Sequence, residues 1–132
     1  MVKAHTVGHP FLTKKYNHII EIPSSEPSTP YLIDCDVVIT DYSSIIFDGY
    51  LLNKPSILYS PNFDYVNRRG MYMKYPQEYS SKIATNEKEL LDLLHSTYEL
   101  TEVEKNCINK VANMCDGHSC ERICDLISNL NN

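Results

Sequence analysis

At 132 residues the chain has the length of one domain, enough for a hydrophobic core but short for a complete nucleotide-dependent transferase. It carries 12 basic and 17 acidic residues and no basic run, which excludes an electrostatic surface for nucleic acid or an anionic membrane. No apolar stretch has the length of a bilayer span, and the N-terminus has no signal-peptide pattern. The five cysteines lack the spacing of a secreted disulfide scaffold, so we expect reduced thiols and a cytoplasmic location.

The first part of the chain predicts short strands separated by turn formers. Residues 2–6 and 18–22 read as strands, and a loop rich in serine and proline leads into one helical turn over 29–34. The β-branched run 37–39 is typical of a buried parallel strand, and apolar residues at helical spacing predict a helix over 42–52. This part therefore predicts a strand that passes directly into a helix.

The second part predicts two more strands, over 55–59 and 83–85, followed by helices. Thr85 or Asn86 is suited to cap the first of these helices, and the last begins near Ser119. The first has Leu90, Leu91 and Leu94 on one face, and the second carries Val103, Cys107, Ile108 and Val111. In the last helix the residues expected to face inward are Cys120, Ile123, Cys124, Ile127 and Leu130. Alternating strands and helices predict an α/β fold, a Rossmann-like parallel sheet with flanking helices.

Polar residues fill the junction between strand 37–39 and its helix. Thr40, Asp41, Ser43 and Ser44 lie where the helix begins, and the first amides of a helix have no partner within it. Hydroxyls and unpaired amides at the positive end of a helix suit a diphosphate. Asp41, Ser43 or Ser44 could instead serve only as an N-cap, so the pattern leaves both interpretations open.

In parallel sheets, ligands bind beyond the carboxyl ends of the strands. His5, the turn 40–44 and Ser60 are all predicted at such ends. We therefore expect these three segments to border one ligand site.

Several ordered blocks of sequence resemble the C-terminal part of the CDP-glycerol glycerophosphotransferases, which prime and polymerise the glycerol phosphate chains of teichoic acids. The resemblance covers nearly the whole chain. The matching residues are 2–6, 36–44 with 47–48, 52–55 with 59–65, 69–72 and 116–122.

This resemblance implies a GT-B-like architecture of two Rossmann-type lobes, in which the C-terminal lobe binds the nucleotide donor. Residues 1–132 would then form a single donor-nucleotide-binding domain, part of a two-lobe enzyme whose acceptor-side lobe is not in this sequence. The donor would be CDP-glycerol, and a lipid-linked polyol phosphate acceptor would be bound through the other lobe. The resemblance further implies a peripheral position on the cytoplasmic membrane face and no cofactor. It leaves open whether the protein forms a homo-oligomer.

The same resemblance assigns roles to individual residues. His5 would contact the donor diphosphate, although His9 beside a proline competes for that alignment. Arg69 would neutralise phosphate, and Asp48 would fix the loop or reach the glycerol or ribose. A second helix-start turn, with Arg122 behind it, would lie near the nucleotide. The complete expected set is His5, Thr40, Asp41, Ser43, Ser44, Asp48, Arg69, Asp116, Gly117, Ser119 and Arg122.

Each of these roles has a structural alternative. Asp48 could be a solvated helix residue, Arg69 could pair with a surface carboxylate, and Gly117 could supply a backbone angle that other residues avoid. The tyrosines at 72, 75 and 79 favour packing as a lid or edge cluster over stacking on cytosine.

A group of thiols and an imidazole near the C-terminus is chemically competent to bind zinc. Cys115, His118, Cys120 and Cys124 lie within ten residues, but their spacing is not that of a zinc ribbon or finger. Cysteines four apart on an apolar helix face favour core packing, so we expect no metal.

The sequence therefore leaves three candidate functions. The leading interpretation is the donor-binding lobe of a glycerophosphotransferase, which would act only with its acceptor-side lobe. The others are a GT-B lobe that uses a UDP-sugar and a non-catalytic remnant or interaction module. A preference for cytidine over uridine nucleotides would separate the first two.

Overall fold

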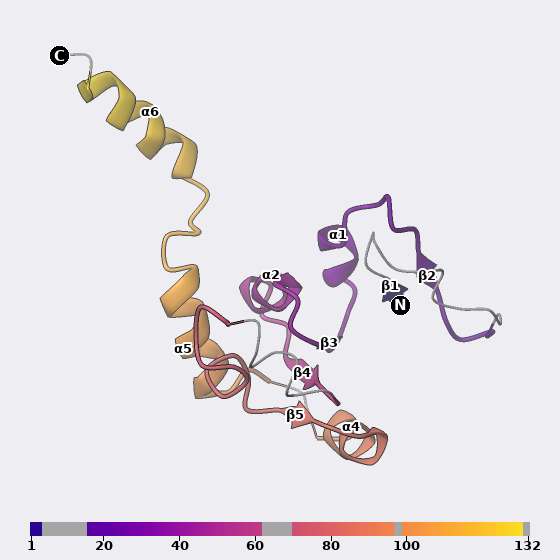
Figure 1. The fold of residues 1–132 in the computed structure, drawn as a ribbon. Coiled ribbons are helices and arrows are strands. Elements are labelled where there is room, and N and C mark those ends of the chain that lie inside the picture. Colours follow the sequence, from indigo (N-terminus) through magenta and orange to yellow (C-terminus); the bar gives the residue numbers. More distant parts are fainter. Residues whose placement is uncertain (4–15, 62–69, 97–98, 131–132) are drawn as a thin grey trace.

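The computed structural model describes residues 1–3, 16–61, 70–96 and 99–130, and its strands form two parallel sheets (Figure 1). The strands are β1 (Val2–Lys3), β2 (Glu21–Ile22), β3 (Val38–Thr40), β4 (Ser56–Tyr59) and β5 (Ile83–Ala84). β1 pairs with β2, and the larger sheet has the order β3-β4-β5. The α/β prediction with a parallel sheet and flanking helices is confirmed.

Helices cover the larger sheet. The described helices are α1 (Thr29–Leu32), α2 (Ile45–Leu51), α4 (Glu87–Leu94), α5 (Glu102–Val111) and α6 (Ser119–Leu130). α2 contacts β3, β4, α1 and α5, whereas α4 contacts β4 and β5. α2 thus lies between the sheet and two other helices, which explains why Ile46 and Tyr50 are buried.

The core forms around one face of α2. Ile46 and Tyr50, one helical turn apart, are 1% and 2% exposed. Gly49 lets α2 approach β3 closely, since a Cβ there would meet Val38 Cγ2 at 3.1 Å. The buried cluster consists of Ile46, Tyr50, Leu58, Met73, Tyr75, Tyr79 and Cys107. Side chains from α2, β4, α5 and the segment 71–80 therefore share one core.

The predicted helix starts at Asn86 and near Ser119 are confirmed, and the structure adds a capping box at the start of α5. The Asn86 side chain accepts a hydrogen bond from the Glu89 amide at 3.0 Å and caps α4. At the start of α5, Thr101 and Glu104 form a capping box, in which each side chain bonds the other residue's backbone.

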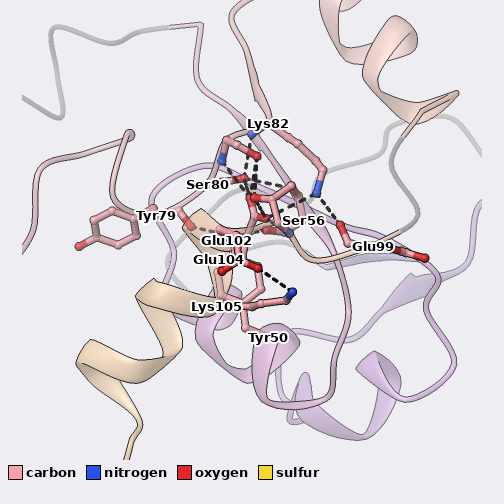
Figure 2. Close-up of polar contacts among 11 residues, drawn as sticks. Tyr50, Ser56, Tyr79, Ser80, Lys82, Glu99, Glu102, Glu104 and Lys105 are labelled. Carbon is pink, nitrogen blue, oxygen red and sulfur yellow. Dashed lines mark hydrogen bonds and ion pairs between the residues drawn. The ribbon is translucent and has the colours of Figure 1, made fainter.

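Glu104 does more than close this capping box, because its carboxylate is fully buried (Figure 2). One oxygen accepts hydrogen bonds from the Ser80 hydroxyl at 2.8 Å and from the Ser81 amide at 2.9 Å. The other accepts from the Thr101 amide at 2.6 Å and lies 3.6 Å from Lys82 Nζ. The carboxylate thus joins the start of α5 to the segment that leads into β5.

These bonds decide the charge state of Glu104. Burial by itself would raise the pKa of Glu104, but the hydrogen bonds from Thr101, Ser81 and Ser80 outweigh it and lower the pKa to about 2. The group is therefore a buried anion at neutral pH. Such an anion stabilises the fold only while its donors stay in place.

A second buried polar link lies beside Glu104. The Tyr50 hydroxyl donates to the Tyr79 carbonyl at 2.8 Å and accepts from the Ser56 hydroxyl at 2.6 Å. Burial raises the pKa of Tyr50, so the phenol stays protonated and keeps donating. Tyr50 thereby fixes α2 to the segment 71–80.

The prediction that α6 turns its apolar face inward is wrong in this structure. α6 extends away from the sheet (Figure 1), and Ile123, Ile127 and Leu130 are exposed. An apolar stripe at helical spacing predicts that a helix has a face to bury, but not what covers it. No other described element packs extensively on α6, so its stripe stays in solvent.

We expect the folded protein to become less stable in acid, because Glu104 becomes protonated. Its pKa in the folded protein lies below the ordinary value of 4.5, so this stabilisation is complete above that pH and is lost towards pH 2. The shift corresponds to about 3 kcal/mol. In urea unfolding at pH 7, Glu104→Gln should lower the free energy of unfolding by about that amount.

The matched control is Glu102→Gln on the same helix, where an exposed carboxylate pairs with Lys105 at 2.9 Å. Exposed pairs contribute little, so this variant should resemble the unmodified protein. Between pH 5 and pH 3 the unmodified chain should lose stability faster than Glu104→Gln. Parallel pH curves for the two would contradict the assignment.

Candidate functional site

The turn between β3 and α2 lies at the carboxyl edge of the larger sheet. Thr40 ends β3 and pairs with Leu58 of the parallel strand β4, so the two strands finish at the same edge. Ser60 follows β4 directly, is 3% exposed, and donates its amide to the Ala84 carbonyl at 2.9 Å. The expected meeting of turn 40–44 with Ser60 at one edge is confirmed.

The two serines of the turn do little to cap α2. Ser44 is the N-cap residue, yet its side chain makes no cap hydrogen bond. The Ser43 hydroxyl accepts from the Ile45 amide at a long 3.4 Å. Among the described residues, none accepts a hydrogen bond from the amides of Ser43 or Ser44. Both serines are exposed among the described residues, so their hydroxyls are accessible to a ligand there.

Tyr75 reaches this turn from the segment 71–80. Its side chain is buried, and its hydroxyl donates to the Asp41 carbonyl at 3.1 Å. Burial raises the pKa of Tyr75, and hydrogen bonding by the Ser60 side chain acts against this rise. The sequence placed Tyr75 in a packed cluster but gave no signal of its contact with Asp41, since 34 residues separate the two partners.

The other two tyrosines of the expected cluster behave differently from each other. Tyr79 is buried, with its ring 5.5 Å from that of Tyr75 and 5.6 Å from that of Phe47. Tyr72 is 90% exposed. Packing is therefore confirmed for Tyr75 and Tyr79, while Tyr72 lies outside the core.

Within the described part of the chain, the charges at this edge are acidic. Asp41 is exposed and Asp48 is half-buried in the first turn of α2. The basic residues expected here, His5 and Arg69, lie outside the described residues, as does the competing His9. A diphosphate at this edge would need such basic residues, because carboxylates alone repel it.

The second expected turn, residues 116–122, is closed by its own contacts. Arg122 Nη1 lies 2.9 and 2.8 Å from the two carboxylate oxygens of Asp116, and its Nη2 donates to the Ser119 hydroxyl at 3.1 Å. Asp116 also accepts from the His118 amide at 3.0 Å. Hydrogen bonds from His118 and Arg122 lower the pKa of Asp116.

Gly117 in this turn has φ 84°, the left-handed region that residues with a Cβ rarely adopt. The structure does not bring the turn to the β3–α2 edge, since α6 extends away from the sheet (Figure 1). Asp116, Gly117, Ser119 and Arg122 thus form one local unit, and Thr40, Asp41, Ser43, Ser44 and Asp48 form another.

The prediction that Cys120 and Cys124 pack in the core is wrong. Cys115, Cys120 and Cys124 are all exposed, because α6 and the turn before it lie away from the sheet. The buried thiol is that of Cys107, whose pKa is raised by burial to about 11. No group of three or more metal-binding side chains is found among the described residues.

None of the helices in the described ranges is long and apolar enough to cross a membrane.

Comparison with known proteins gives a consistent result. The family model for CDP-Glycerol:Poly(glycerophosphate) glycerophosphotransferase matches residues 1–129. A teichoic acid glycerol-phosphate transferase of Staphylococcus aureus is 35% identical over 103 residues, which are 74% of this chain and 26% of that protein. A teichoic acid poly(ribitol-phosphate) polymerase of Bacillus spizizenii is 27% identical over 128 residues, covering 90% of this chain and 20% of that protein.

A teichoic acid ribitol-phosphate primase of Bacillus spizizenii is 27% identical over 127 residues, 91% of this chain and 33% of that protein. The chain thus spans between a fifth and a third of the length of these relatives. The match over residues 1–129 nevertheless includes both candidate segments. The chain belongs to the CDP-glycerol:poly(glycerophosphate) glycerophosphotransferase family.

Proposed function

We propose that this chain is the donor-binding lobe of a glycerophosphotransferase that uses CDP-glycerol in the synthesis of a teichoic-acid-like polymer. The family match over residues 1–129 carries the proposal. The edge formed by the β3–α2 turn and Ser60 supports it, because nucleotides bind at the carboxyl edges of such sheets. Catalysis would require the acceptor-side lobe, from the same chain or another.

The reaction would be attack of an acceptor hydroxyl on the β-phosphorus of CDP-glycerol. A new oxygen–phosphorus bond forms to the acceptor, and the bond between that phosphorus and the bridging oxygen breaks, so CMP leaves with the electron pair. The attacking hydroxyl gives up its proton to a base on the acceptor side. Positioning and neutralisation of phosphate charge would supply most of the rate enhancement.

At the edge of the sheet, Ser43 and Ser44 would hold the diphosphate with their hydroxyls and amides. His5 or His9, together with Arg69, would supply the positive charge that the described edge lacks. Asp48 would accept hydrogen bonds from the glycerol or ribose hydroxyls. Thr40 and Asp41 would shape the start of the turn.

The turn 116–122 has a different part in this proposal. Asp116, Gly117 and Ser119 would contact the nucleotide, and Arg122 would hold the turn through Asp116. The short bonds between Arg122 and Asp116 support this positioning role.

A ribitol phosphate donor is a second candidate. The relatives described above include a ribitol-phosphate primase and a poly(ribitol-phosphate) polymerase, so the family match alone does not identify the polyol. A UDP-sugar lobe and a non-catalytic remnant are the remaining alternatives. Nucleotide and polyol preference separate all four.

We expect calorimetric titration of the purified chain to show tighter binding of CDP-glycerol and CDP than of UDP. His5→Ala should weaken the binding of both cytidine ligands, because it removes a donor to the diphosphate. His95→Ala is the control, since His95 lies at the end of α4.

The outcome also sorts the alternatives. Tighter binding of CDP-ribitol than of CDP-glycerol would favour the ribitol candidate, and a preference for UDP would favour the sugar transferase. Absence of binding to a chain that circular dichroism shows to be folded would contradict the proposal and favour the remnant.

Ser44→Ala should weaken CDP-glycerol binding about threefold to tenfold, the effect of one hydrogen bond. The free energy of unfolding should change little, because the Ser44 side chain makes no cap hydrogen bond. Ser25→Ala, in an exposed loop, is the matched control. Lower stability with unchanged affinity would show that Ser44 has only a structural role.

A further inference from the structure

Tyr75 occupies a place in the fold that packing alone does not explain. Its ring belongs to the buried core, but its hydroxyl lies at the carboxyl edge of the sheet, on the Asp41 carbonyl at 3.1 Å. It therefore connects the core to the turn that bears Ser43 and Ser44.

The ring itself is held firmly. Tyr75 packs edge-on against Tyr79 at 5.5 Å, with 64° between the ring planes, and Tyr79 packs against Phe47 of α2 at 5.6 Å. A buried ring with neighbours on its faces and edges has few alternative orientations. The position of the Tyr75 hydroxyl is thus set by the core.

Ser60 borders the same edge of the sheet. Burial raises the pKa of Tyr75, whereas hydrogen bonding by the Ser60 side chain lowers it. The Ser60 amide donates a hydrogen bond to the Ala84 carbonyl at 2.9 Å, which anchors Ser60 to β5. The contact that joins the Tyr75 hydroxyl to the turn is its hydrogen bond to the Asp41 carbonyl.

The hydrogen bond from Tyr75 to the Asp41 carbonyl restrains a whole peptide unit. The Asp41 carbonyl and the amide that follows it share one rigid plane, so a bond that fixes the carbonyl also fixes the plane. That plane leads directly into Ser43 and Ser44.

We infer that Tyr75 is a positioning residue: the hydrogen bond from its hydroxyl to the Asp41 carbonyl sets the conformation of the turn 41–44 and thereby the affinity of that turn for the diphosphate of the nucleotide donor. This inference rests on the proposed function for the identity of the ligand. The effect of Tyr75 on the conformation of the turn does not depend on the ligand, so this effect and the proposed function can be tested separately.

The test compares Tyr75→Phe with Tyr79→Phe in the full chain. Both variants keep a buried ring and lose one phenolic hydroxyl, but within the described part of the chain the phenol bonded to the Asp41 carbonyl is that of Tyr75. Amide hydrogen exchange of a peptide that covers 41–47 is measured together with calorimetric titration by CDP-glycerol.

Tyr75→Phe should speed exchange in this peptide and raise the dissociation constant for CDP-glycerol about threefold to tenfold. Tyr79→Phe should do neither. Ser60→Ala, which keeps the Tyr75 ring, should act in the same direction. The double variant should be no weaker than Tyr75→Phe alone, because Ser60 acts through the Tyr75 oxygen.

Unchanged exchange in Tyr75→Phe would overturn the inference, whatever the ligand. Faster exchange with unchanged CDP-glycerol affinity would overturn it as well. If the unmodified chain binds no CDP-glycerol, the proposed function fails, and the exchange data alone decide whether Tyr75 positions the turn. Should Tyr75→Phe unfold, Ser60→Ala supplies the same two readouts.

Discussion

The arrangement of helices on the sheet depends on one buried anion, the carboxylate of Glu104. Removing a carboxylate from water is costly, and that cost is offset by the donors from Thr101, Ser80 and Ser81 and by the nearby Lys82 ammonium (Figure 2). These donors come from two segments, the start of α5 and the approach to β5. The charge therefore stabilises only one relative placement of α5 and the sheet.

The segment 71–80 connects the core to the carboxyl edge of the sheet, where the turn 40–44 lies. The Tyr79 carbonyl receives the Tyr50 hydroxyl of α2, and the Tyr75 hydroxyl reaches the Asp41 carbonyl. Both links are buried phenols that bond a backbone carbonyl, and such bonds specify geometry as well as energy. The turn with the two serines is consequently fixed by residues distant in the sequence.

In the C-terminal part, by contrast, the conformation is set by contacts between residues close in the sequence. Asp116 and Arg122 pair across a turn that Gly117 makes possible, and α6 continues outward without a covering element among the described residues. Its apolar spacing predicted the helix correctly and its burial wrongly. Periodicity is a property of the helix itself, whereas burial depends on a partner that the pattern does not name.

By itself, the sequence determined the order of strands and helices, the parallel sheet and the placement of the turn 40–44 and Ser60 at one edge. Those features follow from local periodicity, turn residues and the geometry of parallel strands. Only the tertiary structure decided that Glu104 is a buried anion and that Tyr75 holds Asp41. Contacts between residues 23 and 34 positions apart depend on how the chain packs, and no local pattern encodes them.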